Sequence, residues 1–264
     1  MKIIRFEDAG GDIRLGEPVG DDSARLVKGS LFGGFEVTGE QLGIRRLLAP
    51  LDPVDVISIG LNYRRHAEES GAEVPEFPLI FAKLTSCVIG PGDPIVLPED
   101  APDEVDYEAE LAVVIGKTAR KVSQTDAMQY VLGYTCANDV SARDCQRFRD
   151  KQWTRAKSFD TFCPLGPALL INPAVDPNRL AIRGRLNGQL VQDSSTADMI
   201  FSVRYLVSYL SHQFTLRPGT VILTGTPEGV GFGRKPPVYF KAGDTYAVEI
   251  EGIGELVNPV KRES

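Results

Sequence analysis

The segment DEVDYEAELAVVIG, residues 103–116, carries two carboxylates at a spacing that suits metal binding. Side chains alternate across a β-strand, so Glu108 and Glu110 are expected on one face beside apolar neighbours. Their Cα atoms would be about 6.5–7 Å apart. Two partly buried carboxylates at that distance repel each other unless a cation joins them or one binds a proton. The pattern indicates a divalent cation, and a solvated strand edge with paired acids is the alternative.

A third acidic residue follows the next apolar strand. The segment YVLGYTCAND ends with Asn138 and then Asp139. Three carboxylates offer only oxygen ligands. Oxygen ligands suit a hard cation such as Mg²⁺ or Mn²⁺, with water or substrate at the remaining positions. Glu108, Glu110 and Asp139 are therefore the candidate metal ligands.

His66, one of two histidines in the chain, lies three residues before Glu69 in the segment GLNYRRHAEESG. Residues three apart are neighbours on a helix, so Glu69 can accept a hydrogen bond from the imidazole and fix its tautomer. An imidazole of this kind is a good general base. The charged run 64–77 contains little apolar material, which predicts a flexible lid. The alternative is that His66 lies in a charged turn without a catalytic role. The other histidine, His212, is expected to be structural.

The composition restricts the class of protein. The chain has 264 residues, 42% of them hydrophobic, and can bury a full core. Its net charge is −7 without a long basic run, so nucleic acid and anionic membranes are not expected partners. No apolar segment resembles a signal peptide or a membrane span, and we expect a cytoplasmic protein. The four cysteines lack C-x-x-C spacing and are expected to be reduced packing residues.

The hydrophobic pattern divides the chain into two parts. Residues 1–53 carry short strand-like pieces and one helical segment, EQLGIRRLLAP, and predict a small, mostly β, N-terminal domain. Residues 54–264 are again strand-rich and form the predicted catalytic domain. Helical periodicity is confined there to QTDAMQYVLG, SARDCQRFRDKQW and MIFSVRYLVSYLSHQF. Because helices do not alternate regularly with strands, an α+β fold around a β roll or sandwich is predicted.

Two further segments offer polar groups. The Gly-rich segment VILTGTPEGVGFGRKPP, residues 221–237, lacks the G-K-[ST] ending of a phosphate loop, and prolines follow where a helix would begin. Nucleotide binding is therefore excluded there, but Thr226 can offer a hydroxyl and an amide to a carboxylate. Lys157, in TRAKSFDTFCPLGP, lies in a predicted loop, and an ordinary surface lysine is the alternative.

Six motifs in one order resemble the fumarylacetoacetate hydrolase family over about residues 54–260: GLNYRRHAEE, DYEAELAVVIG, NDVSARDCQ, AKSFDTFCPLGP, LNGQLVQDSSTADMIF and LTGTPEGVG. The resemblance implies a mixed β-sandwich roll, a homodimer, and Mg²⁺ or Mn²⁺ held by the three acidic residues named above. It also implies that Lys157, Arg143, Gln146 and Thr226 contact the carboxylate and oxo oxygens of a 2-oxo acid. His66 and Glu69 would lie on a short mobile helix that closes over the site.

These features together predict a divalent-metal-dependent hydrolase that cleaves a C–C bond in a 2,4-dioxo acid, such as an acylpyruvate or a compound similar to fumarylacetoacetate. The same site could decarboxylate oxaloacetate. His66, oriented by Glu69, would deprotonate water, and Lys157 would stabilise negative charge. One alternative is an isomerase or decarboxylase of the 5-carboxymethyl-2-hydroxymuconate type in aromatic-acid catabolism. A non-catalytic β-rich protein that binds Ca²⁺ is the alternative from another class.

Overall fold

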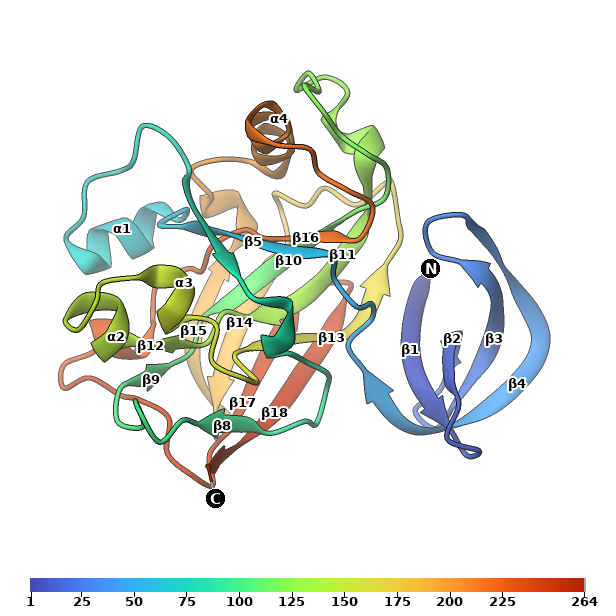
Figure 1. The fold of residues 1–264 in the computed structure, drawn as a ribbon, viewed down its shortest axis with the longest axis horizontal. Helices are drawn as coiled ribbons and strands as arrows, with labels where there is room; N and C mark the ends of the chain where they lie inside the picture. Colours follow the sequence, from blue (N-terminus) through green and yellow to red (C-terminus); the bar gives the residue numbers. More distant parts are fainter. Residues whose placement is uncertain (264) are drawn as a thin grey trace.

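Strands dominate the computed structural model, which describes residues 1–263. The described residues form one sheet of eleven strands, one of five and one of two. Figure 1 shows a large body that contains most of these strands and, beside it, a smaller unit formed by the N-terminal strands. The predicted β-rich α+β fold is confirmed.

The first four strands close into a ring. Each pairs antiparallel with the next, and β1 pairs with both β2 and β4. These strands are β1 (Lys2–Asp8), β2 (Ile13–Val19), β3 (Ser23–Ser30) and β4 (Gly34–Leu48). Closure leaves no long free strand edge in this small unit. The ring connects to the body through β1, whose residues Lys2 and Ile3 pair with the strand β13 (Cys163–Leu170).

The helix expected at residues 40–50 is wrong, because residues 40–48 belong to the long strand β4. Leu42, Ile44 and Leu47 pack against a small cluster formed by buried side chains of the ring and of β13. That cluster contains Ile4, Phe6, Ala24 and Ala168. Apolar residues at this spacing can form one face of a helix or one face of a strand. The segment forms a strand because its apolar side chains find their packing partners in that conformation.

The large sheet continues through the body in the order β13, β11, β10, β16, β5 and β6. Its further strands are β11 (Val131–Asn138), β10 (Ala109–Ile115), β16 (Thr220–Leu223), β5 (Asp55–Gly60), β6 (Leu79–Lys83) and the short β7 (Val88–Ile89). Neighbours are mostly antiparallel, but β16 runs parallel to β5. The sheet is therefore mixed, and β10 and β11 lie at its centre, where all residues of β10 are buried.

The five-stranded sheet packs on the large one. Strands β10 and β11 contact β17, and β13 contacts β18. The five strands, in order, are β15 (Gln189–Ser195), β14 (Ala181–Leu186), β17 (Thr245–Ile250), β18 (Gly254–Arg262) and β8 (Ile95–Leu97). A two-stranded sheet joins β9 (Val105–Asp106) to β12 (Ser141–Ala142). The main hydrophobic core fills the space between the two larger sheets, as in a sandwich.

Helices are few and short. They are α1 (Arg64–Ser70), α2 (Arg143–Arg147), α3 (Trp153–Ala156) and α4 (Val203–Gln213), with 3₁₀ turns at Thr85–Cys87, Ala127–Tyr130, Thr196–Asp198 and Gly231–Gly233. Helix α4 confirms the helical pattern of MIFSVRYLVSYLSHQF. The segment SARDCQRFRDKQW forms two short helices, and QTDAMQYVLG forms only a 3₁₀ turn before it enters β11, so these two predictions were too long. Helices α1, α2 and α3 gather on the side of the body away from the N-terminal ring (Figure 1).

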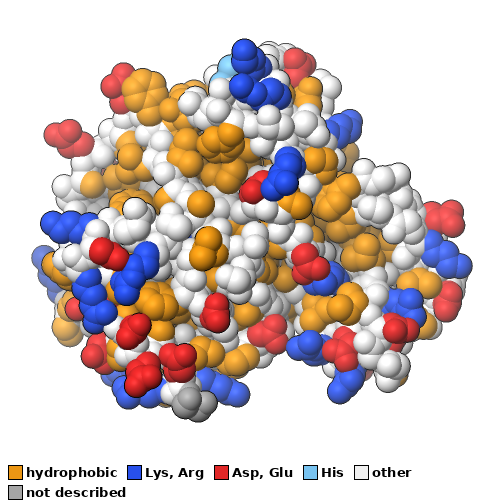
Figure 2. All heavy atoms as spheres, viewed as in Figure 1, with side chains coloured by type: hydrophobic (Ala, Val, Ile, Leu, Met, Phe, Trp, Pro, Cys, Tyr) orange, Lys and Arg blue, Asp and Glu red, His pale blue; other side chains and the backbone are white. Residues whose placement is uncertain are grey.

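Acidic and basic side chains are interspersed over the face of the molecule drawn in Figure 2. No helix within residues 1–263 has both the length and the apolar character needed to cross a membrane. All four cysteines, Cys87, Cys136, Cys145 and Cys163, are buried and free. This agrees with their expected role in packing.

Candidate active site

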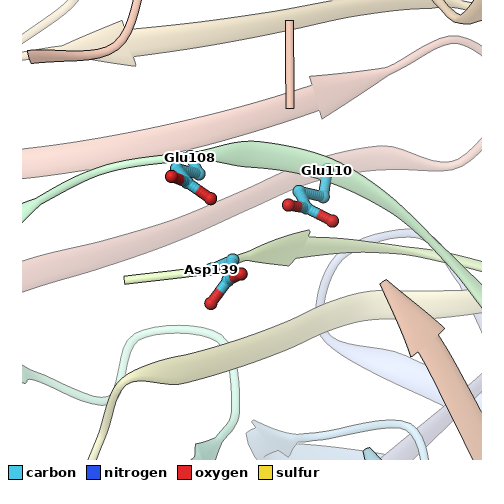
Figure 3. A group of neighbouring side chains, drawn as sticks. All are labelled: Glu108, Glu110 and Asp139. Atoms are coloured by element: carbon cyan, nitrogen blue, oxygen red, sulfur yellow. The ribbon is translucent and has the colours of Figure 1, made fainter. Parts of the chain in front are cut away.

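Strand pairing brings the three acidic residues together. Glu110 lies in β10, Glu108 lies one residue before it, and Asp139 directly follows β11, the antiparallel neighbour of β10. The backbone N–H of Asp139 donates to the carbonyl of Glu108 at 3.0 Å and fixes the two segments at this point. One oxygen of each carboxylate lies within 4.8 Å of the others. Figure 3 shows the three carboxylates around a common space.

Two buried lysines neutralise part of this negative charge. The Lys157 ammonium, at the end of α3, lies 2.7 Å from Glu108 Oε2 and 2.8 Å from Asp139 Oδ2. Lys83, the last residue of β6, reaches Asp139 Oδ1 at 2.5 Å, and both of these side chains are fully buried. Burial lowers the pKa of Lys83, but the Asp139 carboxylate, together with smaller contributions from Cys87 and Cys163, outweighs this effect and leaves the pKa above its ordinary value. Lys83 is therefore charged at neutral pH.

Arg143 connects this group to a fourth buried carboxylate. Its Nε donates to Asp106 Oδ2 at 2.9 Å, and its Nη2 lies 2.7 Å from Glu108 Oε1. Asp106 also accepts hydrogen bonds from the backbone N–H groups of Gly231 (2.7 Å) and Phe232 (3.0 Å). Burial raises the pKa of Glu108, but the charges of Lys157 and Arg143 outweigh burial and lower the pKa to about 2. Glu108 is therefore ionised at neutral pH.

Glu110 has no such cationic partner among the described residues. Its Oε2 accepts a hydrogen bond from the backbone N–H of Gly225 at 2.7 Å. Burial, followed by the charges of Asp139 and Glu108, raises the pKa of Glu110 well above its ordinary value. Four buried carboxylates thus face three cations, and a positive charge is missing beside Glu110. An oxygen-only donor set with one uncompensated carboxylate fits a hard divalent cation.

His66 and Glu69 form the expected pair on α1. The His66 Nδ1 lies 3.2 Å from Glu69 Oε2, and the imidazole is buried. The backbone N–H of Gly229 donates to both Glu69 oxygens, at 3.0 and 3.2 Å. Because a carboxylate accepts at Nδ1, the proton lies on that nitrogen and Nε2 remains the basic one. Gly71, with a positive φ of 65°, ends the helix.

One cavity of about 270 Å³ connects these groups, and its lining includes seven of the nine predicted site residues together with the new ones Phe232 and Arg147. The seven are His66, Glu108, Glu110, Arg143, Gln146, Lys157 and Thr226. Asp139 and Glu69 do not line the cavity themselves, but each holds a residue that does. The rest of the wall is mainly apolar, with Ile59, Phe81 and Trp153. Apolar walls with a few convergent polar groups are typical of small-molecule sites.

The hydroxyl of Thr226 has protein partners on both sides. It donates to the carbonyl of Ala109 and accepts from Gln192 Nε2, both at 2.9 Å. Gln192 in turn accepts at Oε1 from the backbone N–H of Ala109 at 2.9 Å. Gln146 accepts a hydrogen bond from Arg143 Nη1 at 2.8 Å. Substrate contact by Thr226 and Gln146 remains a prediction.

The sequence analysis missed Lys83, Asp106, Gln192, Phe232 and Arg147. Lys83 directly follows the apolar run PLIFA. Asp139 was identified because it follows an apolar strand in the same way. Asp106 stands two residues before Glu108 and could have been included with the acidic segment. Nothing in the local pattern distinguishes Gln192 or Phe232 from ordinary strand and loop residues. The other histidine, His212, lies outside the cavity, and its Nδ1 is 2.9 Å from the carbonyl of Ser208.

Two solved structures with closely similar folds have names that describe reactions on acids. The 5-carboxymethyl-2-hydroxymuconate delta-isomerase from Mycobacterium smegmatis is 42% identical, with a TM-score of 0.88 and full coverage of both chains. The fumarylacetoacetate hydrolase from Exiguobacterium antarcticum is 39% identical, with a TM-score of 0.88 and full coverage of both chains. At these identities the likeness extends beyond the fold.

Sequence comparison also finds curated relatives and family models. A mitochondrial oxaloacetate tautomerase of Xenopus laevis is 52% identical over 217 residues, which cover 81% of this chain and 68% of the relative. Residues 1–54 match a family described as Rv2993c-like, N-terminal. Residues 55–261 match the family described as Fumarylacetoacetate (FAA) hydrolase C-terminal. The chain therefore belongs to the fumarylacetoacetate hydrolase family and is an enzyme of that family.

Proposed function

We propose that this enzyme interconverts the keto and enol forms of a 2-oxo diacid such as oxaloacetate, by proton transfer at the carbon next to the oxo group. The observation that carries the proposal is the His66–Glu69 pair, because it places an oriented base on the same cavity as the carboxylate and lysine cluster. The relative from Xenopus laevis named as an oxaloacetate tautomerase supports this choice of substrate.

Glu108, Glu110 and Asp139 would hold Mg²⁺ or Mn²⁺. When bound, the cation would stabilise negative charge on the 2-oxo oxygen. Lys157 and Lys83 hold the carboxylates Glu108 and Asp139 in place through the ion pairs described above. These contacts keep the oxygen ligands oriented before a substrate arrives.

The side chains around the cavity would carry out the proton transfer. Arg143 and Gln146 would bind the carboxylate next to the oxo group. Nε2 of His66 would accept the proton from C3, while the electron pair of the C3–H bond forms the C2=C3 double bond and the oxo oxygen becomes negative. Return of the proton to that oxygen completes the enol. Glu69 keeps the tautomer of His66 that this step requires, since it holds the Nδ1 proton.

Loss of the ultraviolet absorbance of the oxaloacetate enol measures the proposed reaction directly. With Mg²⁺ or Mn²⁺, the enzyme should speed up this loss well beyond the rate in buffer that contains the same metal. A chelator should abolish the enzyme's contribution to this rate. If the enzyme adds nothing to the rate in metal-containing buffer, the proposal of a tautomerase is wrong.

Hydrolysis of a C–C bond in a 2,4-dioxo acid is the second candidate. The same histidine could deprotonate water, and the relative from Exiguobacterium antarcticum is named as a fumarylacetoacetate hydrolase. Acetopyruvate is a suitable probe, because its cleavage releases acetate and pyruvate. Tautomerisation needs proton transfer alone, whereas hydrolysis also needs a water molecule aimed at a carbonyl, so the two assays on one sample distinguish the candidates.

A further inference from the structure

Arg147 is a charged residue of the cavity wall that no carboxylate neutralises. Arg143 and Lys157, on the same wall, form ion pairs with Asp106, Glu108 and Asp139. Within residues 1–263 the guanidinium of Arg147 has neither an ion pair nor a hydrogen bond. Its neighbours are two aromatic rings, Phe232 with its centre at 4.9 Å and Phe148 at 5.8 Å.

The position of Arg147 follows from α2 and from the Gly-rich loop. Arg147 lies four residues after Arg143, so both project from one face of α2, about 6 Å apart along its axis. Both guanidinium groups contact the ring of Phe232, Arg143 at 4.4 Å and Arg147 at 4.9 Å. Arg143 is buried and Arg147 is exposed. The two arginines therefore mark a path from the buried end of the cavity to its rim.

We propose that Arg147 binds the second carboxylate of a 2-oxo diacid and so makes the enzyme selective for diacids over 2-oxo monoacids. This inference rests on the proposed function, because that function directs the oxo acid end of the substrate to Glu108, Glu110 and Arg143. The other end then points toward the rim. A guanidinium can hold a carboxylate there through two parallel hydrogen bonds, and the contact with the ring of Phe232 limits its movement.

Binding measurements separate this role from catalysis. Isothermal titration with the Mg²⁺-loaded enzyme would compare 2-oxoglutarate with 2-oxopentanoate, which have the same number of carbons but differ in the terminal carboxylate. We expect the wild-type enzyme to bind the diacid about tenfold more tightly. Arg147→Gln should remove most of this preference through weaker diacid binding alone, and Arg147→Lys should keep part of it.

Arg149→Gln is the matched control. Arg149 is exposed and only two residues away, but it pairs with Asp144 at 3.2 Å and does not line the cavity. This variant loses the same charge and should keep the full preference. In steady-state assays with oxaloacetate, Arg147→Gln should raise KM and change kcat little, since Arg147 does not touch the reacting carbon.

Several results would overturn the assignment of Arg147. They are equal binding of both acids by the wild-type enzyme, no measurable binding of either acid, an unchanged preference in Arg147→Gln, or an equal loss in Arg149→Gln. The proposed function can fail separately. If Arg147→Gln abolishes a clear diacid preference but the wild-type enzyme does not accelerate enol loss, the role of Arg147 stands and the tautomerase proposal falls.

Discussion

Glu110 is the carboxylate of the candidate site whose ionised form depends most on a bound metal ion. Burial, and then the charges of Asp139 and Glu108, raise its pKa well above the ordinary value of 4.5. The metal-free protein therefore keeps a proton on Glu110 at pH values where a free glutamate is ionised. A divalent cation that binds here must displace this proton, so protons and metal compete.

We therefore predict that metal affinity increases with pH. Below the raised pKa of Glu110, the dissociation constant for Mn²⁺ should fall by up to about tenfold per pH unit, because one proton leaves as the cation binds. Titration calorimetry over a series of pH values measures this slope. Glu110→Gln should bind the cation weakly and without this slope. An affinity of the wild-type protein that does not change with pH would contradict the assignment.

Lys83 should be important for stability because its charge is buried against Asp139. Lys83→Met leaves the Asp139 carboxylate with less compensation in a dry environment. We expect the metal-free variant to lose about 3–5 kcal/mol of unfolding free energy. Urea denaturation measures this loss. The exposed Lys28→Met is the control and should change stability by less than about 0.5 kcal/mol. A small effect of Lys83→Met would mean that water, or a rearrangement of neighbouring groups, compensates the charge of Asp139 in place of Lys83.

His66 should be the general base of the reaction. His66→Ala should lower kcat for oxaloacetate tautomerisation by about 10²–10⁴, the usual contribution of a positioned base. Decarboxylation of oxaloacetate, if the enzyme catalyses it, should fall much less, because that step needs mainly an electron sink. His212→Ala removes the histidine outside the cavity and should leave both rates unchanged. Equal losses in the two reactions would assign His66 to substrate binding or to closure of α1.

The elements around the site depend on a tight contact between β16 and α1. After β16 the chain turns at Gly225, which has a positive φ of 95° and donates its N–H to Glu110. A Cβ atom at this position would lie 2.8 Å from Cβ of Asn62, two residues before α1. The side chain of Asn62 also holds this turn, since its Nδ2 donates to the carbonyl of Thr224 at 2.8 Å. The turn thus sets both the orientation of Glu110 and the start of α1.

Gly225→Ala should accordingly damage the site and the fold together. The strained φ and the contact with Asn62 predict a loss of about 1–3 kcal/mol in unfolding free energy and weaker binding of Mn²⁺. Thermal unfolding and metal titration measure the two effects. Gly43→Ala is the matched control, because a Cβ there meets no atom within 4 Å. A Gly225→Ala variant with normal metal affinity would show that the turn does not orient Glu110.

The movement of α1 remains a prediction for the same group of elements. The helix has anchors at its first turn, where the N–H of Arg65 donates to Asp198 Oδ2 at 3.0 Å and Arg64 Nη1 donates to the carbonyl of Met199 at 2.8 Å. Residues 72–77, after the helix, are mostly exposed. Any closure over the cavity would therefore pivot near residues 198–199 and involve the exposed segment.

On the scale of the whole molecule, we predict a homodimer in solution. Among residues 1–263 the edge strand β6 pairs on one side only, with β5. Large apolar side chains in and beside it are exposed, among them Leu79 at 43% and Leu84 at 56%. An exposed apolar strand edge commonly pairs with another chain. Light scattering at micromolar concentration measures the mass, and a monomer mass would contradict the prediction.

The division of the chain into two domains, between residues 53 and 54, also remains a proposal.

The sequence by itself determined the part of the site that is local. The period of two along a strand identified Glu108 and Glu110 as neighbours, the end of the next strand identified Asp139, and the helical spacing identified the contact between His66 and Glu69. The order of six motifs was enough to indicate the family and the β-rich fold. The pairs Glu108–Glu110 and His66–Glu69 are close in the chain, Asp139 follows the next predicted strand, and the order of the motifs needs no knowledge of packing.

Only the tertiary structure decided which distant residues complete the site. Lys83 meets Asp139 across 56 positions of sequence, and Gly231 meets Asp106 across 125. No local pattern encodes such contacts, because they arise only when segments far apart in the chain pack together in the folded protein. The conformation of residues 40–50 was decided in the same way, since Leu42 and Ile44 find their apolar partners in β1, β3 and β13. Burial of those side chains outweighed the helical pattern of the segment.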